Sequence, residues 1–163
     1  MSKLKGTKEI NKILNKFLEP FDCIADIGPD FCYWSGSSRI DYTLVVSENQ
    51  DKWFKEFAHS LMPELNCDIF LLSLMHELGH HETIDDIEDD EELWKACWEV
   101  KKELNSKEER TKEDNFIYFN LPDEKMATEW GLHYMKTHPA EISELWNQLQ
   151  PAILKCYQLN DIH

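Results

Sequence analysis

Two histidines and a glutamate within one helical turn have the types and spacing of a metal-dependent hydrolytic site. They stand in the run His76-Glu77-Leu78-Gly79-His80. Residues four positions apart in a helix lie about 40° apart around its axis, so His76 and His80 can direct both imidazoles at one metal ion. Glu77 lies about 60° beyond His80, where its carboxylate could take a proton from a water on that metal. The pattern predicts a zinc ion (Zn²⁺) as cofactor and Glu77 as general base.

The surroundings of this run favour a metal site over a chance match. Residues 67–82 are apolar nearly all round, which predicts a central buried helix. Two imidazoles and a carboxylate are costly to bury unless something pairs with them, and a metal ion does so directly. The competing interpretation is that these are exposed polar residues on an ordinary helix.

A catalytic zinc site needs a third protein ligand and an open fourth position. Glu124 is the favoured third ligand. On a helix it shares its face with Ala127, Thr128 and Gly131, whose small side chains would let this helix approach the histidine helix closely. The remaining candidates for third ligand are Asp123, Glu129 and Glu99.

The order H-E-L-G-H at residues 76–80 and E-K-M-A-T at residues 124–128 resembles the gluzincin-like small metallopeptidases, including those of the ImmA/IrrE type and their phage and mobile-element relatives. The resemblance covers these two short motifs and the order of elements. It implies a minimal zincin-like domain, zinc ligands His76, His80 and Glu124, and hydrolysis of peptide bonds in a protein or peptide substrate. Thr128 stands where the family's E-x-x-A-D pattern has an aspartate that orients a metal-binding histidine; its hydroxyl can donate or accept a hydrogen bond there.

Two further roles follow from the resemblance. An edge strand of the sheet would pair with extended substrate, and residues 40–46 are the candidate, with ordinary sheet core as the equal alternative. A hydrogen-bond donor to the developing oxyanion would come from a tyrosine or histidine. The sequence offers four such residues: Tyr118, His133, Tyr134 and His138.

Periodicity predicts the elements that must position these residues. In the first part of the chain it predicts an amphipathic helix over residues 8–18 and a three-stranded antiparallel meander over residues 21–27, 31–34 and 40–46. Ser47, with Gln50 three residues later, has the spacing of a capping box that opens the next helix.

The second part of the chain is predicted to be mostly helical. After the buried helix, the acidic stretch 82–92 leads into a further helix, and the aromatic run 116–119 is typical of a short strand. Pro122 and Pro139 each suit the first turn of a helix, and Pro151 should kink or split the second of these. We expect one α+β domain spanning residues 1–163, with a small antiparallel sheet packed on several helices.

Composition narrows the partners and the compartment. The chain of 163 residues carries 32 acidic against 17 basic residues, a formal charge of −15, which disfavours nucleic acid and anionic membrane surfaces as partners. No signal peptide or membrane span is evident, and five cysteines without a C-x-x-C pair are typical of reduced thiols, so we expect a cytoplasmic protein. The acidic run 85–92 suggests a preference for basic substrates. A competing function is an acidic protein-binding module with a structural or catalytically idle zinc.

Overall fold

The computed structural model describes residues 4–162, and within them the side chains of all but residues 48–50. The chain divides into two compact units, Met1–Val45 with Thr137–His163, and Val46–Lys136. Over residues 4–162, seven helices and a small mixed sheet confirm the α+β class. The expectation of one domain over residues 1–163 stays a prediction. None of the described helices combines the length and the apolar character that a membrane span requires.

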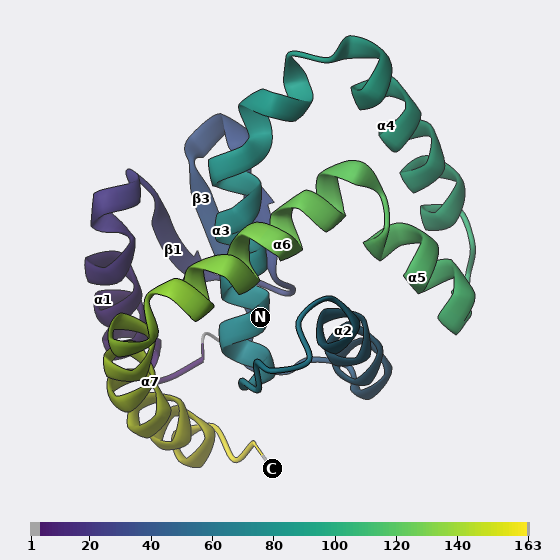
Figure 1. Ribbon diagram of the computed structural model, residues 1–163. Helices are drawn as coiled ribbons and strands as arrows, with labels where there is room; N and C mark the ends of the chain where they lie inside the picture. The colour runs from purple at the N-terminus through teal and green to yellow at the C-terminus, as the bar shows by residue number, and fades with distance from the viewer. Residues whose placement is uncertain (1–3, 163) are drawn as a thin grey trace. The chain divides into compact units, whose positions relative to one another are not determined.

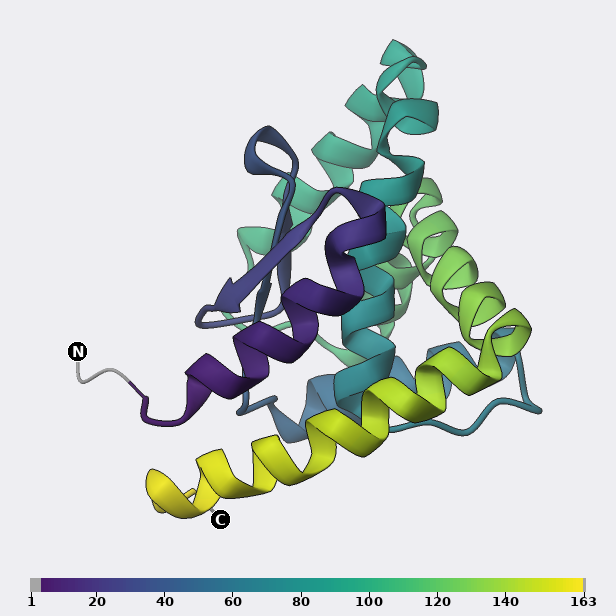
Figure 2. The same ribbon diagram turned by 90° about the vertical axis from the view of Figure 1, so that its left-hand side faces the viewer.

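The first unit begins with the expected amphipathic helix, α1 (Thr7–Leu18), which buries Ile10, Ile13, Leu14 and Leu18. A short 3₁₀ turn containing Pro20 ends it. Three strands follow: β1 (Ile24–Ile27), β2 (Cys32–Trp34) and β3 (Arg39–Tyr42). Helix α1 packs against β1 (Figures 1 and 2).

The sheet is not the antiparallel meander that the sequence suggested. Its order is β1-β3-β2, with β3 antiparallel to β2 but parallel to β1. Burial explains the order, because β3 is the most buried strand and takes the centre. Gly28, which follows β1, also passes so close to β3 that a Cβ there would lie 2.8 Å from the Cβ of Asp41.

The central place of β3 also corrects the substrate-strand hypothesis for residues 40–46. Within these residues the strand ends at Tyr42, and its main chain is already paired on both sides. It therefore has no free edge to offer to an extended peptide. The alternative role, ordinary sheet core, agrees with the burial of Ile40 and Tyr42, neither of which is exposed at all.

The last helix, α7 (Pro139–Leu159), begins at the expected proline and packs on α1. Pro151 lies inside it without splitting it. Beyond its end, Asn160 forms hydrogen bonds with both the N–H and the carbonyl of Lys5, and Cys156 Sγ donates to the same carbonyl at 3.0 Å. Figure 2 shows the end of α7 beside the start of α1. The first and last described segments of this unit are thus tied together.

The second unit contains α2 (Glu48–Leu61), α3 (Ile69–Glu88), α4 (Glu91–Asn105), α5 (Lys112–Phe119) and most of α6 (Pro122–Thr137). Helix α2 begins directly after Ser47, as expected; the side chain of Gln50, the other half of the expected capping box, lies outside the described side chains. Helix α3 starts at the N-cap Asp68, which accepts a hydrogen bond from Phe70 N. It continues to Glu88, further than the expected end near residue 82, because Thr83 and Ile87 extend its buried face.

The aromatic run 116–119 is helical, so the expected strand there is wrong. It forms the end of α5, which Thr111 and Asp114 open as a complete capping box. Lys107 holds the Asp114 carboxylate from the preceding loop at 2.8 Å. The two capping-box hydrogen bonds and the ion pair stabilise the start of the helix. Together they outweigh the strand preference of the four aromatic and β-branched residues 116–119.

Candidate metal centre

Helices α3 and α6 cross at backbone contact, and two glycines make this possible. A Cβ added at Gly79 of α3 would lie 2.1 Å from the carbonyl oxygen of Ala127, and one at Gly131 of α6 would lie 2.8 Å from that of Met75. Figure 1 shows α6 passing across α3. The small residues after Glu124 thus permit the close helix approach that their pattern predicted.

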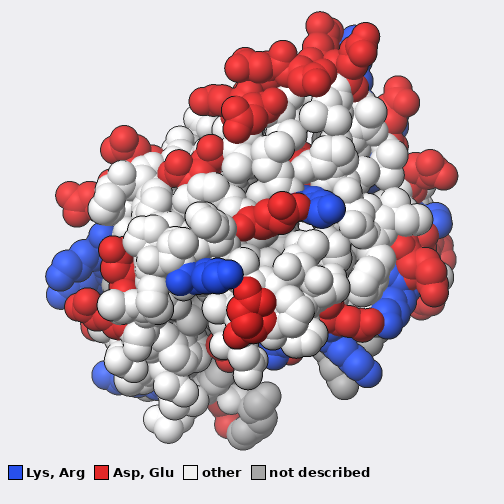
Figure 3. Space-filling view, viewed as in Figure 1, with Lys and Arg blue, Asp and Glu red and all other residues white. Residues whose placement is uncertain are grey.

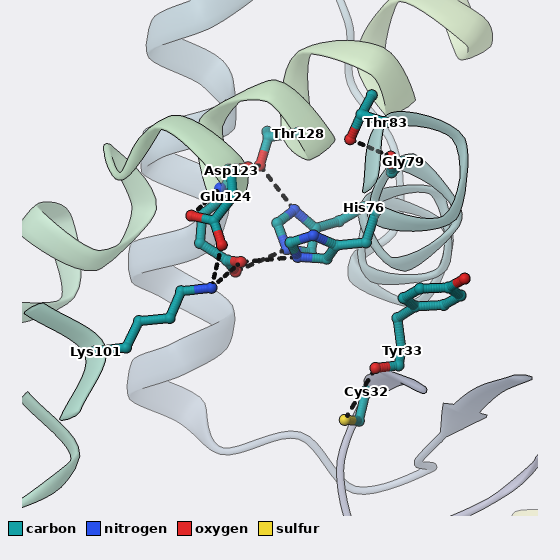
Figure 4. A network of polar contacts seen from close by, with 10 residues as sticks. Cys32, Tyr33, His76, Gly79, Thr83, Lys101, Asp123, Glu124 and Thr128 are labelled. Atoms are coloured by element: carbon teal, nitrogen blue, oxygen red, sulfur yellow. Dashed lines mark hydrogen bonds and ion pairs between the residues drawn. The ribbon is translucent and has the colours of Figure 1, made fainter. Parts of the chain in front are cut away.

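This crossing brings His76, His80 and Glu124 together. Figure 4 shows His76 of α3 facing Glu124 of α6. His76 Nε2 lies 3.3 Å from Glu124 Oε1, and His80 Nε2 lies 2.8 Å from Glu124 Oε2. The potential ligand atoms of the three residues all fall within 4.8 Å of one another. Zinc binds nitrogen and carboxylate oxygen at about 2.0–2.2 Å in tetrahedral sites, which puts neighbouring ligand atoms roughly 3.3 Å apart. The donor set and its spacing therefore fit a zinc ion.

A hydrogen bond from α6 orients His76. Its Nδ1 lies 2.8 Å from Thr128 Oγ1, and the Thr128 hydroxyl donates to the carbonyl of Glu124 at 3.1 Å. Because that hydroxyl proton is committed to the carbonyl, the oxygen can accept from an Nδ1–H on His76. With Nδ1–H held by Thr128, Nε2 is the nitrogen that faces Glu124; it can donate to the carboxylate in the metal-free protein and can bind a metal once that proton has left. Thr128 can thus hold His76 in the orientation that metal binding requires.

Lys101 of α4 enters the same cluster, a contact that the sequence reasoning missed. Its ammonium donates to Glu124 Oε2 at 3.0 Å and forms an ion pair with Asp123. One signal in the sequence could have indicated this position. Lys101 lies on the same face of α4 as Cys97 and Leu104, both buried, and a lysine on an apolar stripe needs a partner.

The charges within this cluster keep both the Glu124 carboxylate and the Lys101 ammonium ionised. Burial by itself would raise the pKa of the Glu124 carboxyl, but His80 and His76 favour its ionised form and hold that pKa well below its usual range. Burial likewise would lower the pKa of the Lys101 ammonium, but Glu124 and Asp123 outweigh it and raise that pKa. The ionised carboxylate of Glu124, which can bind a cation, therefore lies beside the positively charged ammonium of Lys101.

Glu77 and Tyr118 supply the remaining polar groups of interest. Glu77 is buried, next to His76 on α3. The pKa of Tyr118 is raised above its ordinary value, first by burial and then by the negative charges of Glu124 and Glu77. A phenol held in its protonated form within electrostatic reach of these carboxylates is a suitable hydrogen-bond donor.

The other three donor candidates lie elsewhere. His133 is exposed on α6, and Tyr134 stacks on Trp130 with ring centroids 5.3 Å apart. His138 belongs to the first unit, where its Nδ1 lies 2.9 Å from Thr137 Oγ1. Of the four, Tyr118 has a pKa that the charges of Glu124 and Glu77 raise, which makes it the favoured donor.

The alternative third ligands are also placed. Glu99 and Glu129 are exposed, the latter within 4.0 Å of Lys125. Asp123 is buried but pairs with Lys101 and accepts from the backbone N–H of Glu124. The geometry therefore favours Glu124 over all three.

The acidic run is a surface feature. Of residues 85–92 all but Ile87 are exposed, and they form the red area over the end of α3 and the start of α4 at the top of Figure 3. The connection between the two helices is limited to Asp89 and Asp90, since α3 continues to Glu88 and α4 begins at Glu91.

The chain was also compared with known proteins. No protein-family model matches it, and neither does a curated protein or a solved structure.

Proposed function

We propose that this protein is a zinc-dependent metallopeptidase, a hydrolase that cleaves peptide bonds in a protein or peptide substrate. The observation that carries the proposal is the convergence of His76, His80 and Glu124 at distances that suit one zinc ion. Glu77, the residue after the first histidine, adds a buried carboxylate to the same helix. This combination supports hydrolysis more than a purely structural ion, which would need a fourth protein ligand.

The chemistry divides between the ion and the protein. Bound zinc would act as a Lewis acid and make a water nucleophilic at neutral pH. Glu77 takes the proton of the attacking water and passes it to the leaving amine. Thr128 keeps His76 in the tautomer that can bind the ion, and Tyr118 donates a hydrogen bond to the oxygen on which negative charge develops.

The test combines metal analysis with one variant. Protein purified without chelators should contain about one zinc per chain by elemental analysis and should cleave a casein-like substrate. Glu77→Gln should retain the zinc and lose at least about 100-fold in rate, since it removes the general base and no ligand. His76→Ala should lose the zinc. Absence of stoichiometric metal in the wild type would refute the ligand assignment and the function together.

The exposed acidic run 85–92 supports a second candidate, an acidic protein-binding module whose zinc is structural or idle. Zinc retained in wild type and Glu77→Gln, with no cleavage by either, would favour it.

The acidic run 85–92 also supports a basic substrate within the first proposal. Lys/Arg-rich peptides should then be cleaved faster than acidic ones at low salt, with the difference shrinking at high salt; equal rates would refute this preference.

We further propose a cytoplasmic location, which the cysteines support. No disulfide joins any two of the five, which are Cys23, Cys32, Cys67, Cys97 and Cys156. Reduced thiols are the rule in the cytosol and the exception in oxidising compartments. Trapping of thiols in intact cells should find them unoxidised.

A further inference from the structure

Lys101 differs from the other ion-paired lysines of the described chain. Its side chain is 18% exposed, whereas the lysines of the other carboxylate pairs are 43–71% exposed. Removing an ammonium from water is expensive and freezes a flexible side chain, so a buried lysine is retained only where close partners compensate. Here the partners are Asp123 and the candidate zinc ligand Glu124.

The contact falls on the Glu124 oxygen that lies nearer to a histidine nitrogen. Glu124 Oε2 accepts from Lys101 Nζ at 3.0 Å and lies 2.8 Å from His80 Nε2. A divalent ion held between His80 and this oxygen would be close to the ammonium, and like charges repel strongly where water is scarce. The lysine and the metal thus compete for one carboxylate.

Asp123 gives the ammonium a second partner. Its Oδ2 pairs with Lys101, while its Oδ1 accepts from the Glu124 backbone N–H at 2.9 Å, which fixes the aspartate at the start of α6. Lys101 can therefore release Glu124 to an incoming ion without being left unpaired. In Figure 4 the lysine reaches the two carboxylates of α6 from α4, while His76 comes from α3.

We propose that Lys101 is a built-in competitor of the metal: its ammonium replaces the ion's charge in the metal-free protein, stabilising that state, and weakens zinc binding. The inference rests on the proposed zinc site. It makes a prediction opposite to that of a lysine that merely orients Glu124, because loss of an orienting group weakens metal binding, whereas loss of a competitor strengthens it.

Two neutral variants and one charged variant separate these roles. Lys101→Met removes the charge and the hydrogen bonds, and Lys101→Gln removes the charge but keeps an N–H donor; both should lower the zinc dissociation constant about tenfold or more. A neighbouring opposite charge changes the pKa of a carboxyl by about 1–3 units, and we expect an effect of similar size on the zinc dissociation constant. Lys101→Arg keeps the charge and should stay within about threefold of wild type.

The metal-free protein should respond in the opposite direction. Without the ammonium, two buried carboxylates lose the lysine that they share, so Lys101→Met should lower the unfolding temperature in chelator by about 5 °C or more. The matched control is Lys107→Met, in the same unit, which removes an ammonium 2.8 Å from Asp114 and should leave zinc affinity unchanged.

The measurements are zinc competition against a chromophoric chelator, thermal unfolding in EDTA, and absorption of the Co²⁺-loaded protein. Tighter zinc binding by Lys101→Met and Lys101→Gln, with the same tetrahedral cobalt spectrum as wild type, supports the competitor role. Unchanged or weaker binding by both, in a chain whose wild type binds one zinc, overturns it while leaving the zinc site intact. A wild type that binds no zinc overturns both proposals. If Lys101→Met does not fold, Lys101→Gln alone decides by the same criteria.

Discussion

A single methyl group at Gly79 tests the helix crossing on which the site depends. The added Cβ of Gly79→Ala would lie 2.1 Å from the carbonyl oxygen of Ala127, which is 1.3 Å inside the 3.4 Å where ordinary contact begins. The overlapping atoms are a Cβ fixed to the α3 backbone and a main-chain carbonyl oxygen of α6, so no side-chain rotation can relieve the overlap. Helices α3 and α6 have to move apart by about 1 Å, the size of the overlap.

The magnitude follows from two opposing effects. Alanine is the better helix former by about 1 kcal/mol, which would stabilise an exposed position. Overpacking in a close-packed interior costs about 1–3 kcal/mol, and a backbone clash belongs at or above the upper end. We expect a net loss of about 2 kcal/mol, or roughly 4–8 °C in unfolding temperature for a chain of this size.

The same shift should damage the site. Glu124 lies one turn before Ala127 on α6, so moving the helix by about 1 Å exceeds the ±0.2 Å tolerance of metal–ligand distances. Zinc affinity should fall at least about tenfold, measured by chelator competition beside circular dichroism melts in EDTA. Ala96→Gly, at an exposed position of α4, calibrates the helix-propensity effect at about 1 kcal/mol. A Gly79→Ala protein that melts at or above the wild-type temperature and keeps its zinc affinity would refute the close crossing.

Three further perturbations test separate features. Thr128→Val should weaken zinc binding about 10–100-fold by titration, because it removes the acceptor for His76 Nδ1, while Thr128→Ser should keep most of the affinity. Thr111→Ala should cost about 1 kcal/mol in urea unfolding, since Asp114 N loses its capping acceptor; an unchanged midpoint would contradict the cap. Because the pKa of Glu124 is depressed in the folded state, its ionised form stabilises the metal-free protein fully above about pH 4.3 and less as the pH falls toward the folded-state value; the stability gap to Glu124→Gln should narrow there, and a gap that widens in acid would contradict the sign.

Local patterns predicted the helices better than the sheet. The period of α1 places Ile10, Ile13, Leu14 and Leu18 on one face, and all four are buried, because a helix face depends only on nearby residues. Strands of three or four residues carry little information on pairing. The order β1-β3-β2 depends on contacts such as that of Gly28 with Asp41, which the chain pattern does not display.

The candidate site shows the same division. The four-residue spacing of His76 and His80 is local, and the small residues after Glu124 indicated a close helix approach, so the sequence could bring these three together. Lys101 escaped because its position near the end of α4 also suits a solvated lysine that complements the helix dipole. Only the folded structure shows that its aliphatic chain points inward, so that the ammonium reaches the carboxylates of Asp123 and Glu124.

The tie between Lys5 and the end of α7 bears on the order in which the chain can fold during synthesis. The unit that contains the candidate site, Val46–Lys136, is continuous in sequence, so all the contacts within it are available once its last residue has left the ribosome. The other unit has to wait for α7 and Asn160, because α7 packs on α1 and Asn160 bonds to Lys5. At about 5–20 residues per second, synthesis of residues 137–160 takes roughly 1–5 s. That delay is long compared with the folding of small helical units, so residues 46–136 can form the candidate zinc site before α1 finds its partner.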